Sequence, residues 1–90
     1  MKFTVTWSED AKRKLMELWI AAADRRAITD ATNRIDTELR RHADTAGEER
    51  STTRRIFFAP PLAIEFRISM DDRLATVFAV WRYPSKDQND

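Results

Sequence analysis

The sequence contains no cysteine, a single glycine and no long apolar run, and each absence excludes a class of protein. Without cysteine the chain has no disulfide, no thiolate metal ligand and no cysteine nucleophile, which suits a reducing cytoplasm. One glycine cannot build a glycine-rich phosphate loop. No stretch approaches the roughly 18 apolar residues of a membrane span, and the opening MKFTVTW reads as a strand rather than a signal peptide. We therefore expect a cytoplasmic protein that does not contact a membrane.

The chain also has only one histidine, His42, which limits both catalysis and metal binding. A serine–histidine–aspartate arrangement would have to use it, but it stands at the expected end of a helix, where a cationic or packing role is typical. Glu38 and His42 are four residues apart and could both contact a metal, yet no third ligand is near them. We therefore expect no metal site and no cofactor.

What the chain does contain is the balance of a small globular protein. Its 90 residues are 42% apolar and 34% charged, which predicts one domain over residues 1–90 with a polar tail at 84–90. The net charge is only +1, without the excess expected of a non-specific nucleic-acid binder. Residues 50–82 nevertheless hold six arginines against three acids, and arginine presents a planar fork that suits phosphate. These arginines are Arg50, Arg54, Arg55, Arg67, Arg73 and Arg82.

The first half of the chain predicts a strand followed by two helices. KFTVTW alternates apolar and polar residues, as a half-buried strand does. Ser8 precedes two acidic residues and indicates a helix start, with the helix running to about residue 23 or 24. After a charged joint at 24–26, apolar residues recur at steps of three and four from Ile28 to Leu39. Two amphipathic helices so close together predict an antiparallel hairpin.

The second half predicts three strands. Residues 43–53 read as an exposed loop. RRIFFA is a short strand ended by two prolines, LAIEFRIS alternates cleanly, and LATVFAVWRY follows the acidic turn MDDR as a central strand with apolar residues on both faces. The order β-α-α-β-β-β predicts an α+β fold in which the helical hairpin packs on one face of a mostly antiparallel four-stranded sheet. The first strand is expected at the far side, parallel to the last.

The aromatic residues allow two interpretations. Exposed together on a sheet, they would form a base-stacking platform; buried, they would fill the core. We expect the core, because a chain of this size needs its large side chains inside. The residues concerned are Phe57, Phe58, Phe66, Phe78, Trp7 and Trp19.

A cationic sheet face is the strongest candidate site. Glu65 and Arg67 alternate with apolar residues, so they stand on the face that the helices leave open, or else form an ordinary solvated surface. Arg54 or Arg55 would point the same way. Regular alternation in the last strand puts Val77, Ala79, Trp81 and Tyr83 on one face and Phe78, Val80 and Arg82 on the other. Arg82 and Tyr83 could then serve one site only through a twist or bulge near Pro84.

Three segments together resemble the RelE/ParE toxins of bacterial type II toxin–antitoxin systems: VTWSEDAKRKLMEL, AITDATNRIDTELRR and RRIFFAPPLAIEFRISMDDRLATVFAVWRYP. The resemblance implies a compact α+β fold, a cognate antitoxin as partner, and one of two activities. One branch of the family cleaves mRNA in the ribosomal A site, and the other inhibits DNA gyrase without catalysis. A non-toxic interaction domain of the same fold is the third alternative, which the near-neutral charge favours.

The resemblance also implies roles for individual residues in a metal-independent endoribonuclease. Arg55, or else Arg54, matches the arginine that starts a strand and holds phosphate, and Tyr83 matches the aromatic residue near the end. Arg82 stands where some members have histidine, and arginine cannot act as a general base. From the face geometry, Arg67 is a further cation and Glu65 is the nearby carboxylate that could act as a base. We also expect Arg50, Arg54 and Arg73 to contact RNA phosphates.

Overall fold

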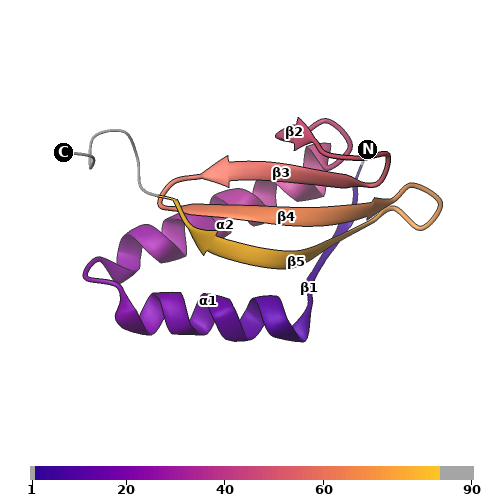
Figure 1. Ribbon diagram of the computed structural model, residues 1–90. Helices are drawn as coiled ribbons and strands as arrows, with labels where there is room; N and C mark the ends of the chain where they lie inside the picture. Colours follow the sequence, from indigo (N-terminus) through magenta and orange to yellow (C-terminus); the bar gives the residue numbers. More distant parts are fainter. Residues whose placement is uncertain (1, 84–90) are drawn as a thin grey trace.

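The structure, a computed structural model, describes residues 2–83, so the expected tail at 84–90 lies outside the described residues. Two helices cover one face of a mixed sheet whose strand order is β1-β5-β4-β3-β2. Figure 1 views the sheet with α2 behind it and α1 along β5. The elements are β1 Thr4–Trp7, α1 Glu9–Ala21, α2 Arg25–His42, β2 Glu48–Glu49, β3 Arg54–Ala59, β4 Leu62–Ser69 and β5 Leu74–Arg82. The predicted α+β class and helical hairpin are confirmed.

The helix boundaries follow from caps. The Ser8 hydroxyl accepts the Ala11 amide at 3.1 Å and begins α1. The Asp24 carboxylate accepts the Ala27 amide at 3.1 Å and begins α2, so the predicted joint at 24–26 is already the start of the second helix. Arg25 then donates to the carbonyls of Trp19 and Ile20 at 3.1 and 3.0 Å, capping the end of α1. No helix within residues 2–83 is long and apolar enough to cross a membrane.

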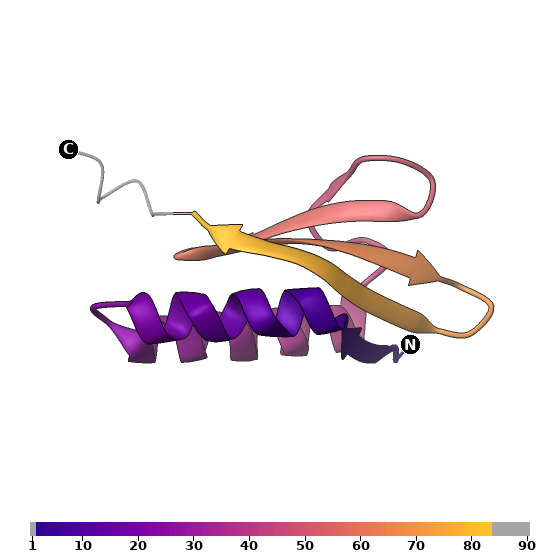
Figure 2. The same ribbon diagram turned by 60° about the horizontal axis from the view of Figure 1, so that its bottom comes forward.

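The core lies between α2, α1 and the sheet. The apolar stripe of α2 is fully buried against β1, β3 and β4, whereas His42 at its end is exposed. The helices form one layer and leave the opposite face of the sheet uncovered (Figure 2). Buried core residues are Phe3, Ala11, Ile28, Ala31, Ile35, Leu39, Ala43, Ala46, Ala59, Leu62, Ile64, Phe66, Ala75, Val77 and Val80.

Within residues 2–83 the sheet has five strands rather than the predicted four. β1 pairs in parallel with β5, as expected, but β2 adds a short antiparallel strand to β3. The segment 43–53 is therefore not a simple exposed loop, since Ala43 and Ala46 are buried and Gly47 adopts a φ of 66°. A Cβ atom at Gly47 would lie 1.9 Å from the carbonyl oxygen of Ile56. β2 consists of two glutamates, which show no alternation of apolar and polar residues, so the sequence pattern did not predict this strand.

A β-bulge interrupts β5. Glu65 pairs with Ala79 and Phe66 with Val77, so Phe78 is an extra residue on the β5 side. The bulge reverses the alternation, and Val77 and Val80 are both buried under the helices. The predicted division of residues 77–83 into two faces is therefore wrong across the bulge, because regular alternation cannot anticipate an inserted residue.

The aromatic residues divide between the two faces. Phe66 is buried in the core and Phe57 packs against it, as predicted. Phe58 pairs with Ala63 on the uncovered face and is 36% exposed, and Trp19 is 39% exposed on α1. The expectation that all six residues pack in the core is wrong, because strand alternation gives the core only every second residue of β3.

Candidate functional site on the open face

The open face is the side of the sheet that no helix covers. Residues paired across neighbouring strands point to the same face, so the register divides this face into lateral rows, and three of these rows carry the candidate residues. The cation row is Arg54, Arg67, Thr76 and Thr6. The acid row is Glu48, Ile56, Glu65 and Ala79. The aromatic row is Phe58, Ala63 and Trp81.

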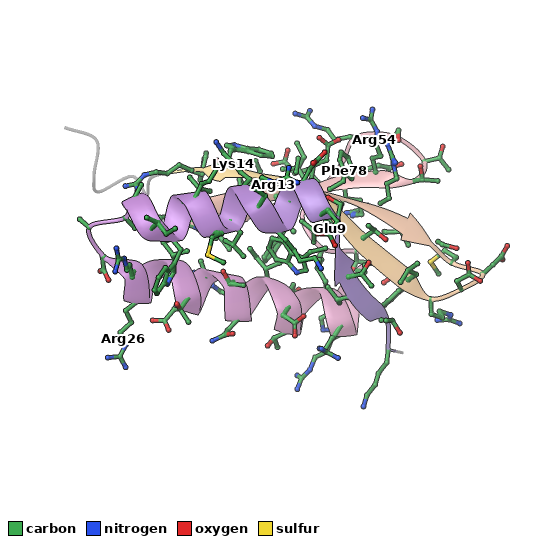
Figure 3. The ribbon with its side chains drawn as sticks, turned by 90° about the horizontal axis from the view of Figure 1, so that it is seen from below. Glu9, Arg13, Lys14, Arg26, Arg54 and Phe78 are labelled. Carbon is green, nitrogen blue, oxygen red and sulfur yellow. The ribbon has the colours of Figure 1, made fainter. Side chains whose placement is uncertain are left out.

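Arg54 and Arg67 are register partners in the cation row, and each guanidinium group has a different neighbour. Arg54 Nη1 lies 3.3 Å from Glu65 Oε2, and this carboxylate side chain is 20% exposed. Arg67 lies over the ring of Phe78, with 4.6 Å between Cζ and the ring centroid. Arg54 and Phe78 project from the side of the sheet away from α2 (Figure 3). The bulge thus supplies the aromatic surface on which Arg67 rests.

The other end of the open face is aromatic. The rings of Phe58 and Tyr83 meet at a centroid distance of 4.8 Å with an interplanar angle of 45°. The Tyr83 amide donates to the Pro61 carbonyl at 2.8 Å, which holds Tyr83 beside the beginning of β4. Arg82 pairs in register with Leu62, a core residue, so its side chain leaves the strand on the helix side.

The cationic and aromatic ends do not converge. Ala63 in the aromatic row and Arg67 in the cation row are four residues apart on β4, which corresponds to about 13 Å along a strand. Tyr83 therefore lies far from Arg67 on the same face, and Arg82 lies on the opposite face. Of the five expected catalytic residues, Arg55, Arg67, Arg82 and Tyr83 are not brought to one point, and Glu65 lies beside Arg54.

Arg55 stabilises the fold and does not face the candidate site. It pairs in register with Phe66 and therefore leaves β3 on the helix side. Its guanidinium donates to the carbonyls of Ala46 and Gly47 at 2.7 and 3.1 Å. Of the two neighbouring arginines that the sequence could not separate, Arg54 is the one on the open face.

Two further arginines lie outside the rows. Arg50 is exposed in the segment between β2 and β3, where its amide donates to the Arg54 carbonyl at 2.9 Å. Arg73 is in the turn between β4 and β5 with a φ of 51°. Its Nη1 is buried and has no hydrogen-bond partner among the described residues. Their predicted phosphate contacts stay a prediction.

A hollow of about 420 Å³ opens beside the cation row. Its hydroxyl groups and the Arg67 guanidinium are donors of the kind that bind phosphate oxygens. Thr53 and Thr76 were not singled out from the sequence, because only the strand register places them beside Arg67. Within residues 2–83 no three His, Cys, Asp or Glu side chains are grouped as a metal site. The lining residues are Thr53, Arg67, Ile68, Ser69, Leu74 and Thr76.

Comparison with known proteins identifies the fold. No family model and no curated protein match the chain. The RelBE2 toxin–antitoxin complex of Mycobacterium tuberculosis contains a chain that is 16% identical, with a TM-score of 0.76 over 94% of this chain and 95% of that one. For the chromosomal ParDE system of P. aeruginosa the identity is 15% and the TM-score 0.72, over 90% and 96%. The archaeal RelE–RelB complex of Pyrococcus horikoshii gives 13% and 0.56, over 92% and 97%. The chain has the RelE/ParE toxin fold.

Proposed function

We propose that this protein is the toxin component of a type II toxin–antitoxin system and acts in the cytoplasm. The supporting observation is the extent of the structural likeness, which spans 90–94% of this chain and 95–97% of three chains from toxin–antitoxin complexes. The common fold therefore accounts for nearly all of this sequence and of the three chains compared with it. A cognate antitoxin is the partner that this function requires.

The antitoxin surface that we propose begins at the outer edge of β3. β2 pairs only with Arg55 and Ile56, so residues 57–59 have no neighbouring strand on that side within the described part of the chain. An exposed strand edge accepts an added strand through its backbone groups. An antitoxin segment paired there would cover the exposed ring of Phe58 and reach the open face.

The target that we propose is single-stranded mRNA on the ribosome. Proteins bind single-stranded nucleic acid by combining cations for the backbone with aromatic rings for the bases. The open face supplies Arg54 and Arg67 at one end and Phe58 and Tyr83 at the other. This spatial division suits a strand lying along β4, with phosphate over the cation row and a base on the aromatic rings.

Cleavage on this face would need no metal. Glu65 would remove the proton from a 2′-hydroxyl group, the alkoxide would attack the adjacent phosphorus, and the 5′ oxygen would leave with a proton from water. Arg54 and Arg67 would stabilise the negative charge on the phosphorane. Tyr83, at the far end of the face, would hold a base rather than transfer a proton.

A DNA gyrase inhibitor that acts by binding alone is the second candidate. The observation that favours it is the separation of Arg67, Tyr83 and Arg82, which leaves no acid–base pair on the described open face. Because a binding protein does not need such a pair, the same surface would serve it unchanged.

Induced expression in a bacterial host separates these functions. For the mRNA endonuclease we expect translation arrest and ribosome-dependent cuts in mRNA by primer extension, and Arg67→Ala should abolish both. Arg41→Ala, which removes an exposed arginine on α2, is the matched control and should stay toxic. Intact mRNA with inhibited supercoiling would identify the gyrase inhibitor. Unimpaired growth without an antitoxin would contradict a toxin of either kind.

A further inference from the structure

Glu65 occupies an unexpected place for a surface that binds RNA. It lies in the middle strand of the open face, between the cation row and the aromatic row, and its carboxylate contacts Arg54. We infer that Glu65 is an internal counter-ion, which occupies the phosphate-binding edge of Arg54 in the free protein. An RNA phosphate then meets Arg67 alone, and must displace Glu65 before Arg54 can bind it.

The first argument is the crowding of positive charge. Arg54 and Arg67 are direct register partners on antiparallel strands, a position in which like charges repel. The protein compensates the two guanidinium groups in different ways. Glu65 neutralises Arg54 at 3.3 Å, whereas Arg67 receives only the face of the Phe78 ring at 4.6 Å.

The two kinds of partner leave different groups free. A guanidinium stacked on a ring keeps the N–H groups along its edge available for a bidentate contact with phosphate. A carboxylate beside Nη1 instead neutralises the positive charge of Arg54 and competes with an incoming phosphate for that side of the guanidinium. Arg67 is therefore ready to bind an anion in the free protein, whereas Arg54 must first give up its contact with Glu65.

The surroundings of Glu65 hold it in this role. Its register partners on either side are Ile56, which is 6% exposed, and Ala79, so neither neighbour can offer it a hydrogen bond from its side chain. With only 20% of its side chain exposed, the carboxylate has little water to replace Arg54. The inference rests on the proposed function only in taking RNA as the anion; the masking of Arg54 follows from the geometry alone.

The test measures how strongly variants bind a fluorescein-labelled ten-nucleotide oligouridine, by anisotropy between 50 and 200 mM NaCl. Glu65→Gln frees Arg54, so we expect binding to tighten between about two- and fivefold, the range of a partly exposed ion pair. One added phosphate contact should also steepen the plot of log K against log salt by about 0.7. Unchanged or weaker binding would overturn the inference.

Glu48→Gln is the matched control. Glu48 lies in the same acid row and loses the same charge, but it forms no ion pair within residues 2–83. Its slope should stay that of the unmodified protein. Arg54→Ala alone should change affinity by less than twofold, and in the Glu65→Gln background it should remove the whole gain. A large loss from Arg54→Ala alone would show that Arg54 is already free.

Elution from immobilised heparin keeps the inference testable even if the oligonucleotide does not bind. Heparin is a sulfated polyanion and reports the availability of Arg54 without involving RNA. Glu65→Gln should elute at higher salt than Glu48→Gln, and equal elution would overturn the inference. Later elution combined with no oligouridine binding would keep the counter-ion and count against RNA as the target. Circular dichroism confirms that each variant is folded.

Discussion

At the scale of single residues, strand alternation gives adjacent arginines opposite tasks. Arg54 stands on the open face, and Arg55 reaches under the sheet to the carbonyls of Ala46 and Gly47. The sequence established that one of the pair would face outward, but it could not say which. That choice depends on the register of β3 against β4, in which Arg54 pairs with Arg67 and Arg55 with Phe66.

Replacing Arg54 and replacing Arg55 should therefore have different effects on the free energy of unfolding. Arg55→Ala leaves the carbonyls of Ala46 and Gly47 without their charged donor, and we expect the free energy of unfolding to fall by about 2 kcal/mol. Arg54→Ala breaks only a partly exposed ion pair and should cost less than about 1 kcal/mol. Urea denaturation of both variants measures the difference. An equal loss in the two would contradict the assigned faces.

Arg73 offers the opposite case, a residue whose replacement should stabilise the fold. Its φ of 51° costs a residue with a Cβ atom about 1 kcal/mol or more, and its Nη1 is buried without a partner in the described chain. Both Arg73→Gly and Arg73→Ala remove the buried guanidinium, but only glycine relieves the backbone. We expect the free energy of unfolding of Arg73→Gly, measured with urea, to exceed that of Arg73→Ala by about 1 kcal/mol. Equal stability would show that the turn carries no strain.

At the scale of elements, the spacing of apolar residues predicted the regular helices and strands but not their irregularities. The helical hairpin, the three long strands and the parallel β1–β5 pair all follow from apolar spacing and caps. The bulge did not, because Phe78 stands in an unbroken apolar run where an extra residue leaves no mark. The place of Tyr83 on the open face, and of Val80 in the core, depends on that one residue, so this part of the site was beyond sequence reasoning.

The bulge predicts an unusual tolerance. Deleting Phe78 would leave Val77 and Ala79 adjacent, facing the core and the open face as they do now, so both halves of β5 keep their register. We expect this variant to unfold cooperatively, with a lower melting temperature because Arg67 loses its ring. Deleting Thr76 instead shifts a regular stretch by one residue and should prevent folding. Thermal melts by circular dichroism distinguish the two, and failure of both variants would refute the assigned bulge.

At the scale of the whole molecule, the sheet should be most stable at its centre. β4 and β5 share eight register pairs, whereas β2 contributes only two residues at the edge. Local opening requires less free energy where fewer contacts are lost. We expect amides of the β4–β5 ladder to exchange hydrogen only by global unfolding, and those of Glu48 and Glu49 to exchange fastest among the strands. Hydrogen exchange followed by NMR measures this order, and a protected β2 would contradict it.

The parallel pairing of β1 with β5 also imposes an order on synthesis. Thr4 finds its partner Leu74 seventy positions later in the chain. While a ribosome elongates this polypeptide, β1 therefore has no partner strand. In the same period α1 has no β5 to pack against. Non-local pairing of this kind slows folding. The nascent chain thus cannot assemble the open face before β5 has been synthesised, which, for the function that we propose, would delay its action until then.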